Sequence, residues 1–146
     1  HFSWQIAEKH DINVIVPLLD SFSKEHEPFY IETQGLAHFD GKETILFIKI
    51  VPEKLVVEMH KKLWGLLLPH SQTVSTLYSP KTWTPHITLT SKGLTTEATM
   101  REIKQFLAPE PFLWRMRVDN ILLASQSSED SFDVSHRFQL GKGLIA

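Results

Sequence analysis

The stretch that decides the fold is Trp83-Thr84-Pro85-His86-Ile87-Thr88-Leu89-Thr90, in the second half of the chain. After the proline, polar and apolar side chains alternate, and this period of two predicts a β-strand. One face of the strand carries Ile87 and Leu89, and the other carries His86, Thr88 and Thr90. Proline suits the first position of a strand, where no ladder hydrogen bond is lost. The strand therefore presents an imidazole and hydroxyl groups in a row.

A related pattern opens the chain in His1-Phe2-Ser3-Trp4-Gln5-Ile6. Phe2, Trp4 and Ile6 take the apolar parity, while His1, Ser3 and Gln5 take the polar one, so this segment also reads as a strand. A histidine followed two positions later by a hydroxyl side chain thus occurs on two predicted strands.

The remaining elements follow from periodicity and turn residues. Gly35 is expected to form a bulge or bend, and Asp40-Gly41 is a hairpin signal. The helix after residue 52 is expected to bury Leu55, Met59, Leu63 and Leu66 or Leu67. The predicted segments are a helix from about residue 12, strands over 29–39 and 44–51, helices from about 52 and 95, and strands over 112–118 and 132–140.

These segments repeat one order, strand, helix, strand, turn, strand, and the repeat predicts the architecture. We expect an α+β fold of duplicated β-α-β-β units, with a central groove between two antiparallel sheets. The chain would form a single bilobal domain, with lobe one at about 1–51, a connecting helix at about 52–68 and lobe two at about 82–146. A pseudo-two-fold axis would bring both histidine strands to the groove.

Composition limits the classes of function. The chain has 146 residues, enough for one domain, and its formal net charge of −2 argues against an extended nucleic-acid surface. No cysteine is present, which excludes disulfides and thiolate metal sites. No apolar run is long enough for a membrane span. We expect a cytoplasmic monomer with no membrane contact and no cofactor.

Two facing histidines can act as an acid and base pair, because one can remove a proton while the other donates one. The hydroxyls of Ser3 and Thr88 can donate to phosphate oxygens. This arrangement suits phosphodiester cleavage without a metal. A strand histidine is also commonly a hydrogen-bonded structural residue, and the duplication of the pattern is what favours catalysis here.

Other chemically interesting residues have ordinary explanations. Tyr78 and Trp83 have the chemistry to stack on a base, although aromatic residues at such positions more often pack. His60, beside two lysines, is expected on the solvated face of its helix. Lys49 interrupts an otherwise apolar strand close to its end and is expected to reach water. No histidine spacing indicates a zinc site.

At these residues the chain resembles the 2H phosphoesterase superfamily, which includes the LigT-like 2′-5′ RNA ligases and cyclic phosphodiesterases. The resemblance rests on His1-Phe2-Ser3, on Pro85-His86-Ile87-Thr88-Leu89 and on the ending Arg137-Phe138-Gln139-Leu140-Gly141. It implies a bilobal α+β fold and metal-independent hydrolysis of 2′,3′-cyclic or 2′-5′-linked phosphodiesters of nucleotides or RNA ends. By position, His1 and His86 would be catalytic, and Ser3 and Thr88 would bind phosphate. It also implies that a strand and helix precede the first motif.

Two other functions remain open from the residues alone. A nucleotide or RNA-end binding module with the same groove would bind ligand without turnover, and a metallohydrolase would lose its activity in a chelator. The physiological substrate, hydrolysis or ligation, and the division of acid and base roles are likewise open.

Overall fold

The computed structural model of the protein describes residues 1–41, 44–90, 96–128 and 131–141. It is a mixed α+β structure, as predicted. Its helices are α1 (Ile12–Glu25), α2 (Lys54–Leu67) and α3 (Glu97–Leu107), with short 3-10 turns η1 (Leu68–His70) and η2 (Thr76–Tyr78). Its strands are β1 (Ala7–His10), β2 (Phe29–Phe39), β3 (Ile45–Ile50), β4 (Ser71–Val74), β5 (His86–Thr88), β6 (Arg115–Val118), β7 (Asn120–Ser128) and β8 (Ser131–Gln139).

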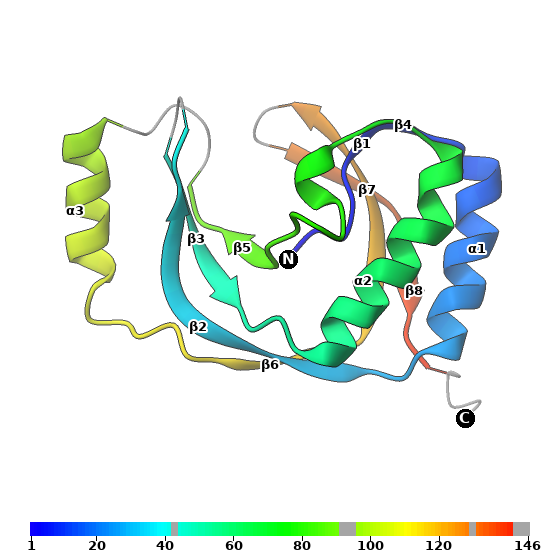
Figure 1. Ribbon diagram of the computed structural model, residues 1–146, viewed down its shortest axis with the longest axis horizontal. Helices are drawn as coiled ribbons and strands as arrows, with labels where there is room; N and C mark the ends of the chain where they lie inside the picture. The colour runs from blue at the N-terminus through cyan, green and yellow to red at the C-terminus, as the bar shows by residue number, and fades with distance from the viewer. Residues whose placement is uncertain (42–43, 91–95, 129–130, 142–146) are drawn as a thin grey trace.

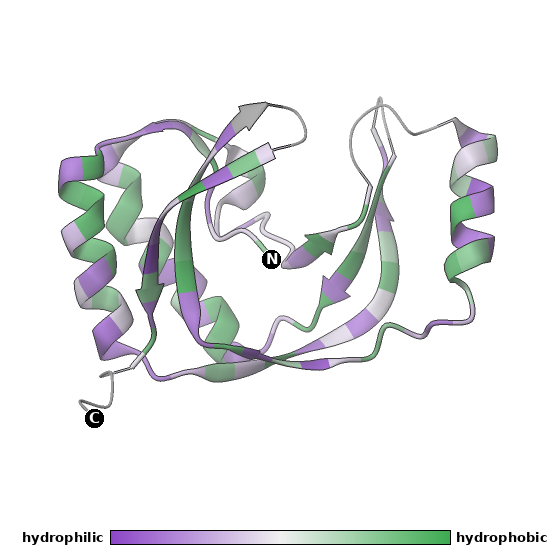
Figure 2. Ribbon diagram, turned by 180° about the vertical axis from the view of Figure 1, so that it is seen from behind, coloured by the Kyte–Doolittle hydropathy of each residue, from purple (hydrophilic) through white to green (hydrophobic). Residues whose placement is uncertain are grey.

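All described strand pairs are antiparallel. One sheet has the order β5-β3-β2-β6, and β1 pairs with β4 and β7 with β8. Figure 1 shows that these sheets curl into an open half-barrel, with α3 outside one wall and α1 and α2 at the other. The N-terminus and β5 both lie between the walls, and the view from behind in Figure 2 places them in the same way. The curl therefore gathers the two predicted motif segments on the inner side.

The long strand β2 bends at Gly35, which confirms the predicted bulge. Gly35 has a φ of +93°, a conformation that favours glycine, and the register with β3 shifts between Thr33 and Leu36. The first half of β2 pairs with β6 and the second half with β3. The bent strand β2 thus pairs with β6 before the bend and with β3 after it, and this bend curves the sheet.

Thr33 is the polar anchor of this bend. Its hydroxyl is buried, donates to the carbonyl of Phe112 at 2.6 Å and accepts from the amide of Trp114 at 2.8 Å. Phe112 has a φ of +51°, so the chain entering β6 is held in an unusual conformation at this point. The Phe112 carbonyl also accepts from the amide of Gly35, at a longer 3.3 Å, so Thr33 and Gly35 together hold the entry to β6.

Substitution of Thr33 by valine keeps the shape of the side chain and removes both hydrogen bonds. We expect the free energy of unfolding to fall by about 1–3 kcal/mol, since the Trp114 amide loses its partner and the Phe112 carbonyl keeps only the longer bond from Gly35. Urea titration of the two proteins measures this difference. Thr99→Val, at an exposed hydroxyl bond within α3, is the control, and an equal loss there would contradict the role of Thr33.

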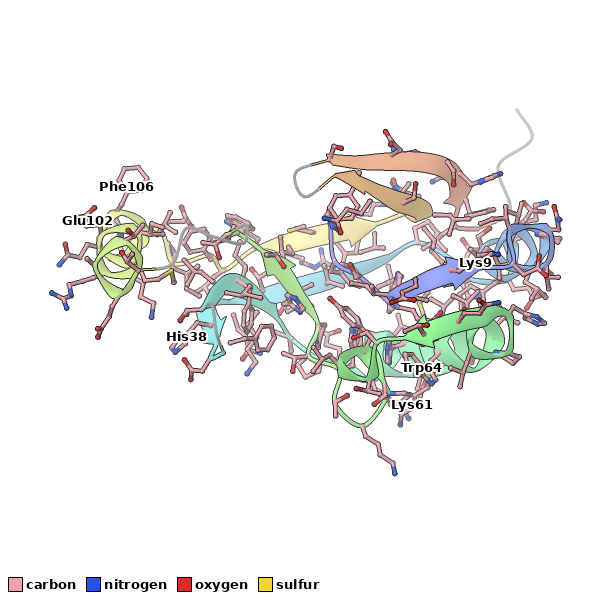
Figure 3. All side chains as sticks on the ribbon, turned by 90° about the horizontal axis from the view of Figure 1, so that it is seen from above. Lys9, His38, Lys61, Trp64, Glu102 and Phe106 are labelled. Atoms are coloured by element: carbon pink, nitrogen blue, oxygen red, sulfur yellow. The ribbon has the colours of Figure 1, made fainter. Side chains whose placement is uncertain are left out.

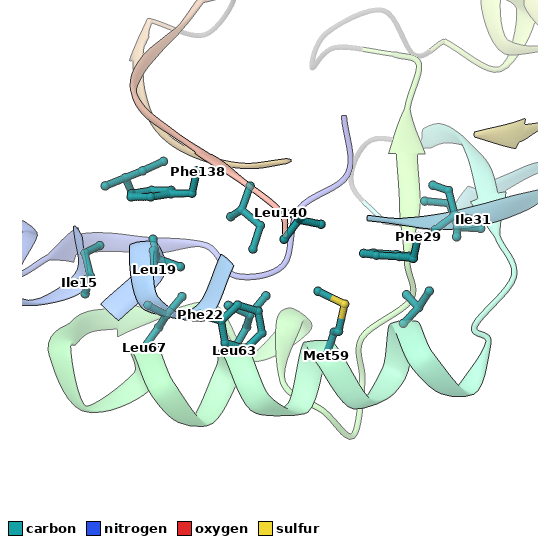
Figure 4. Packing of buried hydrophobic residues seen from close by; sticks show 14 residues of the cluster. Ile15, Leu19, Phe22, Phe29, Ile31, Met59, Leu63, Leu67, Phe138 and Leu140 are labelled. Carbon is teal, nitrogen blue, oxygen red and sulfur yellow. The ribbon is translucent and has the colours of Figure 1, made fainter. Parts of the chain in front are cut away.

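The main core joins parts of the chain that are far apart in sequence. Residues of α1 and α2 pack with the C-terminal strands, as Figure 4 shows. The cluster comprises Ile15, Leu19, Phe22, Phe29, Ile31, Ile50, Val56, Met59, Leu63, Leu67, Ile121, Leu123, Phe138 and Leu140. The predicted stripe of α2 is correct at Met59, Leu63 and Leu67. Leu55 was misplaced, because it is 49% exposed and the neighbouring Val56 is fully buried.

Helix α3 is much less embedded than the other two. Met100 is buried and Phe106 is 83% exposed, and Figure 3 shows Phe106 and Glu102 pointing away from the rest of the protein. Thr96 caps the helix by accepting from the amide of Thr99 at 3.2 Å. No helix in the described ranges is long and apolar enough to cross a membrane.

The predicted strand over residues 1–6 is not formed, which corrects the sequence interpretation. The first strand is β1, and its pairing with β4 begins at Ala7 opposite Val74. Only the carbonyl of Ile6 takes a ladder-like bond, from the amide of Ser75 at 2.9 Å. The aromatic side chains of this segment pack instead against a loop, as described below, and that contact replaces strand pairing.

Candidate functional site

The second motif forms strand β5, as predicted, although the strand covers only His86–Thr88. Pro85 lies just before the strand, and its carbonyl accepts from the amide of Ile50 at 3.0 Å. Because the pairing with β3 begins at His86, the missing N–H of the proline removes no hydrogen bond of the ladder. In the pairing with β3, His86 stands opposite Lys49 and Thr88 opposite Phe47. Directly opposed residues of an antiparallel pair project from the same face of the sheet. His86, Thr88, Lys49 and Phe47 therefore share one face.

Thr90 does not continue this polar row. It is buried, and its hydroxyl accepts from the amide of Leu46 at 2.9 Å. Beyond the end of β5, this side-chain hydroxyl replaces a backbone carbonyl as the acceptor for a strand β3 amide. Thr90 is therefore a structural residue.

The His86 ring is oriented by a backbone hydrogen bond. Its Nδ1 lies 2.7 Å from the carbonyl of Thr84, and since a carbonyl can only accept, Nδ1 carries the proton. In the neutral imidazole this leaves Nε2 with a free lone pair, and Nε2 makes no hydrogen bond to any described residue. The backbone thus fixes both the tautomer and the direction of the ring.

Aromatic rings surround His86. The ring centroids of Phe39 and Phe47 lie 5.0 and 5.1 Å from it, both in edge-to-face geometry, and Tyr78 lies at 6.5 Å. Burial raises the pKa of the Tyr78 phenol above its usual value of 10, so its hydroxyl stays protonated at neutral pH. The site around His86 is therefore a half-buried aromatic surface with one phenolic donor.

The two candidate phosphate-binding hydroxyls differ in setting. Thr88 is exposed on β5, and Ser3 is half-buried in the irregular segment before β1. Neither hydroxyl has a hydrogen-bond partner among the described residues. Both are available to donate to a ligand.

His1 is exposed, and its ring lies edge-on to Phe132 of β8 with a centroid distance of 5.6 Å. No hydrogen bond or ring contact joins His1 to His86 in the described part of the chain. The pairing of the two histidines therefore stays a prediction.

Trp83 joins the two motif segments. Its indole Nε1–H donates to the carbonyl of Ser3 at 3.1 Å, and its ring stacks on Trp4 with a centroid distance of 5.6 Å. Trp83 stands three residues before His86 in sequence. The segment carrying Ser3 is therefore held next to the segment that leads into β5, and Trp83 is a packing residue.

His60 was wrongly expected on the solvated face of its helix. It is 1% exposed, it lies on the buried stripe of α2, and its Nε2 donates to the carbonyl of Tyr78 at 3.0 Å. Burial lowers its pKa below the usual 6.5, while hydrogen bonding to the backbone of Tyr78 and of Trp4 raises it in part. Its helix neighbours Lys61 and Trp64 lie on the outer side of α2, as Figure 3 shows.

Lys49 is a candidate that the sequence interpretation missed. It is half-buried and stands opposite His86 on the inner strand β3. The sequence contains an indication of this role, because Lys49 is the single charge of an apolar strand. Burying a charge costs free energy unless the charge binds a partner or reaches water. An ammonium beside His86 would attract an anionic ligand.

Substitution of Lys49 by methionine should weaken the binding of a phosphate-containing substrate. We expect KM to rise by about tenfold or more, since a charge-assisted hydrogen bond contributes about 1.5–3 kcal/mol, with a smaller change in kcat. Steady-state kinetics with a nucleoside 2′,3′-cyclic phosphate measures this effect. Lys62→Met, on the exposed side of α2, is the matched control, and an unchanged KM in Lys49→Met would contradict the assignment.

The described residues form no metal centre at His86. The described residues contain no group of three or more histidine or acidic side chains that would hold a metal ion. Two surface hollows, of about 550 and 700 Å³, lie along β1 and β4 and beside α3, away from His86. The chemistry available at β5 is therefore that of imidazole, hydroxyl and ammonium groups on one open face.

Comparison with known protein families agrees with this constellation. The family model of the 2′-5′ RNA ligase superfamily matches residues 3–130, which include Ser3, Lys49, His86 and Thr88. No curated protein matches the chain significantly. Because the family match covers most of the chain and both hydroxyl positions, the chain belongs to the 2′-5′ RNA ligase superfamily of 2H phosphoesterase, LigT-like proteins.

Proposed function

We propose that this protein is a metal-independent phosphodiesterase that acts on nucleotides or RNA ends. Its substrates would carry a 2′,3′-cyclic phosphate or a 2′-5′ phosphodiester bond. His1 and His86 would serve as the acid and base pair, and Ser3 and Thr88 would bind the phosphate. Membership of the superfamily supports the class of reaction, and the residues supply the mechanism.

The observation that carries this proposal is the setting of His86. A backbone carbonyl holds its Nδ1–H, and its Nε2 lone pair is free on the strand face that also bears Thr88 and Lys49. A general base needs a basic atom fixed within reach of the proton it removes. A structural histidine would instead have both ring nitrogens engaged or its ring enclosed, as His60 does.

The proposed hydrolysis needs one bond to form and one to break. One histidine removes a proton from water while the water oxygen attacks phosphorus. The other, protonated, gives its proton to the 2′ or 3′ oxygen as the P–O bond to that oxygen breaks. Charge gathers on the non-bridging oxygens in the transition state, where the hydroxyls of Ser3 and Thr88 and the Lys49 ammonium would stabilise it. A 2′,3′-cyclic phosphate opens to a single nucleoside monophosphate, whereas a 2′-5′-linked dinucleotide gives a nucleoside and a nucleoside monophosphate.

Turnover in the presence of excess chelator tests this function. The protein is incubated with each of the four nucleoside 2′,3′-cyclic phosphates and with a 2′-5′-linked diadenylate, and products are separated by chromatography. We expect a monophosphate product from at least one substrate, and His86→Ala should slow its formation by at least about 100-fold. His70→Ala, at a half-buried histidine of η1 away from β5, should retain it.

The alternatives give different results in the same assay. Saturable binding of a nucleotide without product at any pH would identify a binding module and refute catalysis. Activity that appears only after a divalent metal is restored would identify a metallohydrolase.

A further inference from the structure

His60 occupies an unusual place between the helix α2 and the two motif segments. It lies on the buried stripe of α2 with Val56, Met59 and Leu63 and is 1% exposed. A polar ring in an apolar core is costly unless it is hydrogen-bonded. Its Nε2–H meets that need by donating to the carbonyl of Tyr78, at 3.0 Å, in the turn η2 that precedes β5.

The face of the same imidazole contacts the loop before His86. It stacks on the Trp83 ring with a centroid distance of 3.8 Å and an interplanar angle of 5°. Trp83 in turn stacks on Trp4 and donates to the carbonyl of Ser3. A continuous set of contacts therefore runs from α2 through His60 and Trp83 to the segment that carries Ser3.

These contacts matter because the segment that carries Ser3 has no strand ladder of its own, whereas His86 is held by the pairing of β5 with β3. Residues 1–6 lie outside the strands, and so do residues 79–85, which lead from η2 into β5. The position of Ser3 relative to β5 therefore depends on side chains, through the packing of Phe2, Trp4 and Trp83 on the main core and through the contacts of His60 on α2. The Phe2 ring extends the set at its outer end, with an edge-to-face contact to Trp4 at 4.8 Å.

We propose that His60 is a positioning residue of the site formed by the two motif segments. It holds the Tyr78 carbonyl and the Trp83 ring, and through Trp83 it sets where the Ser3 segment stands relative to His86 on β5. This inference rests on the proposed function for its kinetic consequence. His60 itself is enclosed and touches no position that a substrate can reach, so it takes no part in proton transfer.

Two variants of His60 separate its hydrogen bond from its ring. His60→Phe keeps an aromatic face on Trp83 and loses the donor to Tyr78, whereas His60→Gln keeps an amide donor and loses the ring. Leu19→Ala is the control, because Leu19 is 3% exposed in the core and lies on α1, a helix that carries neither motif. Each protein is measured for its melting temperature, for kcat and KM with the cyclic nucleotide that the wild type hydrolyses, and for the indole N–H resonance of Trp83.

We expect His60→Phe to fold, to shift the Trp83 resonance and to lower kcat by at least about tenfold, since a displacement of about 1 Å can cost 100-fold in rate. KM should change by less than about threefold, because Thr88 and Lys49 keep their places on the paired strands β5 and β3. His60→Gln should recover part of kcat. Leu19→Ala should lower the melting temperature and leave kcat within about twofold, because the loss is confined to packing.

Wild-type kcat in a folded His60→Phe, or an equal loss of kcat in Leu19→Ala at the same melting temperature, would overturn the proposal. If His60→Phe does not fold, His60→Gln decides it: an unchanged Trp83 resonance with wild-type kcat there would refute the role of the ring. If the wild type itself turns over no substrate, the proposed function fails, and the Trp83 resonance then decides the positioning claim. An unshifted resonance in both variants would contradict that claim.

Discussion

Replacing His86 by alanine is expected to lower kcat/KM for a 2′,3′-cyclic nucleotide by about 10²- to 10⁴-fold, the usual contribution of one general acid or base. The reason is geometric as well as chemical. The Thr84 carbonyl holds Nδ1–H, so Nε2 is the only nitrogen that can exchange a proton with substrate. Alanine removes that atom without disturbing the pairing of β5 with β3, which uses backbone groups alone.

The size of the loss must be separated from unfolding. The melting temperature of His86→Ala should remain near that of the wild type, since His86 is only half-buried and its aromatic neighbours Phe39 and Phe47 stack on each other at 4.1 Å. His86→Gln offers a second control, because it retains a polar group that cannot serve as a general base. Activity of either variant within about tenfold of the wild type would contradict proton transfer by His86.

Thr88→Val is expected to give the second largest loss, about 10²- to 10³-fold in kcat, which is typical for removal of one donor to a developing oxyanion. Valine keeps the branched shape and suits a strand, so β5 should remain intact. The hydroxyl of Thr88 has no partner in the described protein, and its loss should leave the free energy of unfolding nearly unchanged. Kinetics and urea titration on the same preparation measure both quantities.

Thr88→Ser is the matched control for this prediction. Serine restores the donor and lacks only the methyl group, so kcat should return to within about tenfold of the wild type. A valine variant as active as the serine variant would show that the hydroxyl has no part in stabilising the phosphate. Equal loss in both would point to the methyl group and to packing.

Much of the fold could be read from the sequence because its local signals agree with its tertiary structure. Alternation after Pro85 predicted β5, and Gly35 predicted the bulge that bends β2. The order of elements predicted an α+β fold with antiparallel sheets. In these places propensity, pattern and turn chemistry favour the same conformation.

The failures have a physical cause in long-range contacts. Residues 1–6 alternate like a strand, but a strand needs a backbone partner, and Trp83 binds this segment through its side chain instead. In α2, a stripe drawn through Leu55 leaves His60 outside, whereas one drawn through Val56 includes it. Periodicity located the helix correctly and could not decide between two adjacent faces, because the choice depends on the strands that cover it.

Only part of the candidate site could be predicted from the sequence. His86 and Thr88 lie together on one strand, as the pattern requires, and Lys49 joins them only through the register of β3 with β5. The periodicity of one strand cannot predict how that strand pairs with another, so the sequence did not place Lys49 beside His86. The contact of His1 with Phe132 likewise depends on the C-terminal hairpin, far away in sequence.

The pH dependence of kcat/KM for cyclic nucleotide hydrolysis tests the central claim, that two histidines act as an acid and base pair, most directly. We expect a bell-shaped profile for the wild type, because one imidazole must be neutral and the other protonated. His1→Ala and His86→Ala should each lose a different limb of the bell while retaining measurable turnover. A bell of unchanged shape and height in His1→Ala would contradict the pair and assign the acid or base role to another residue.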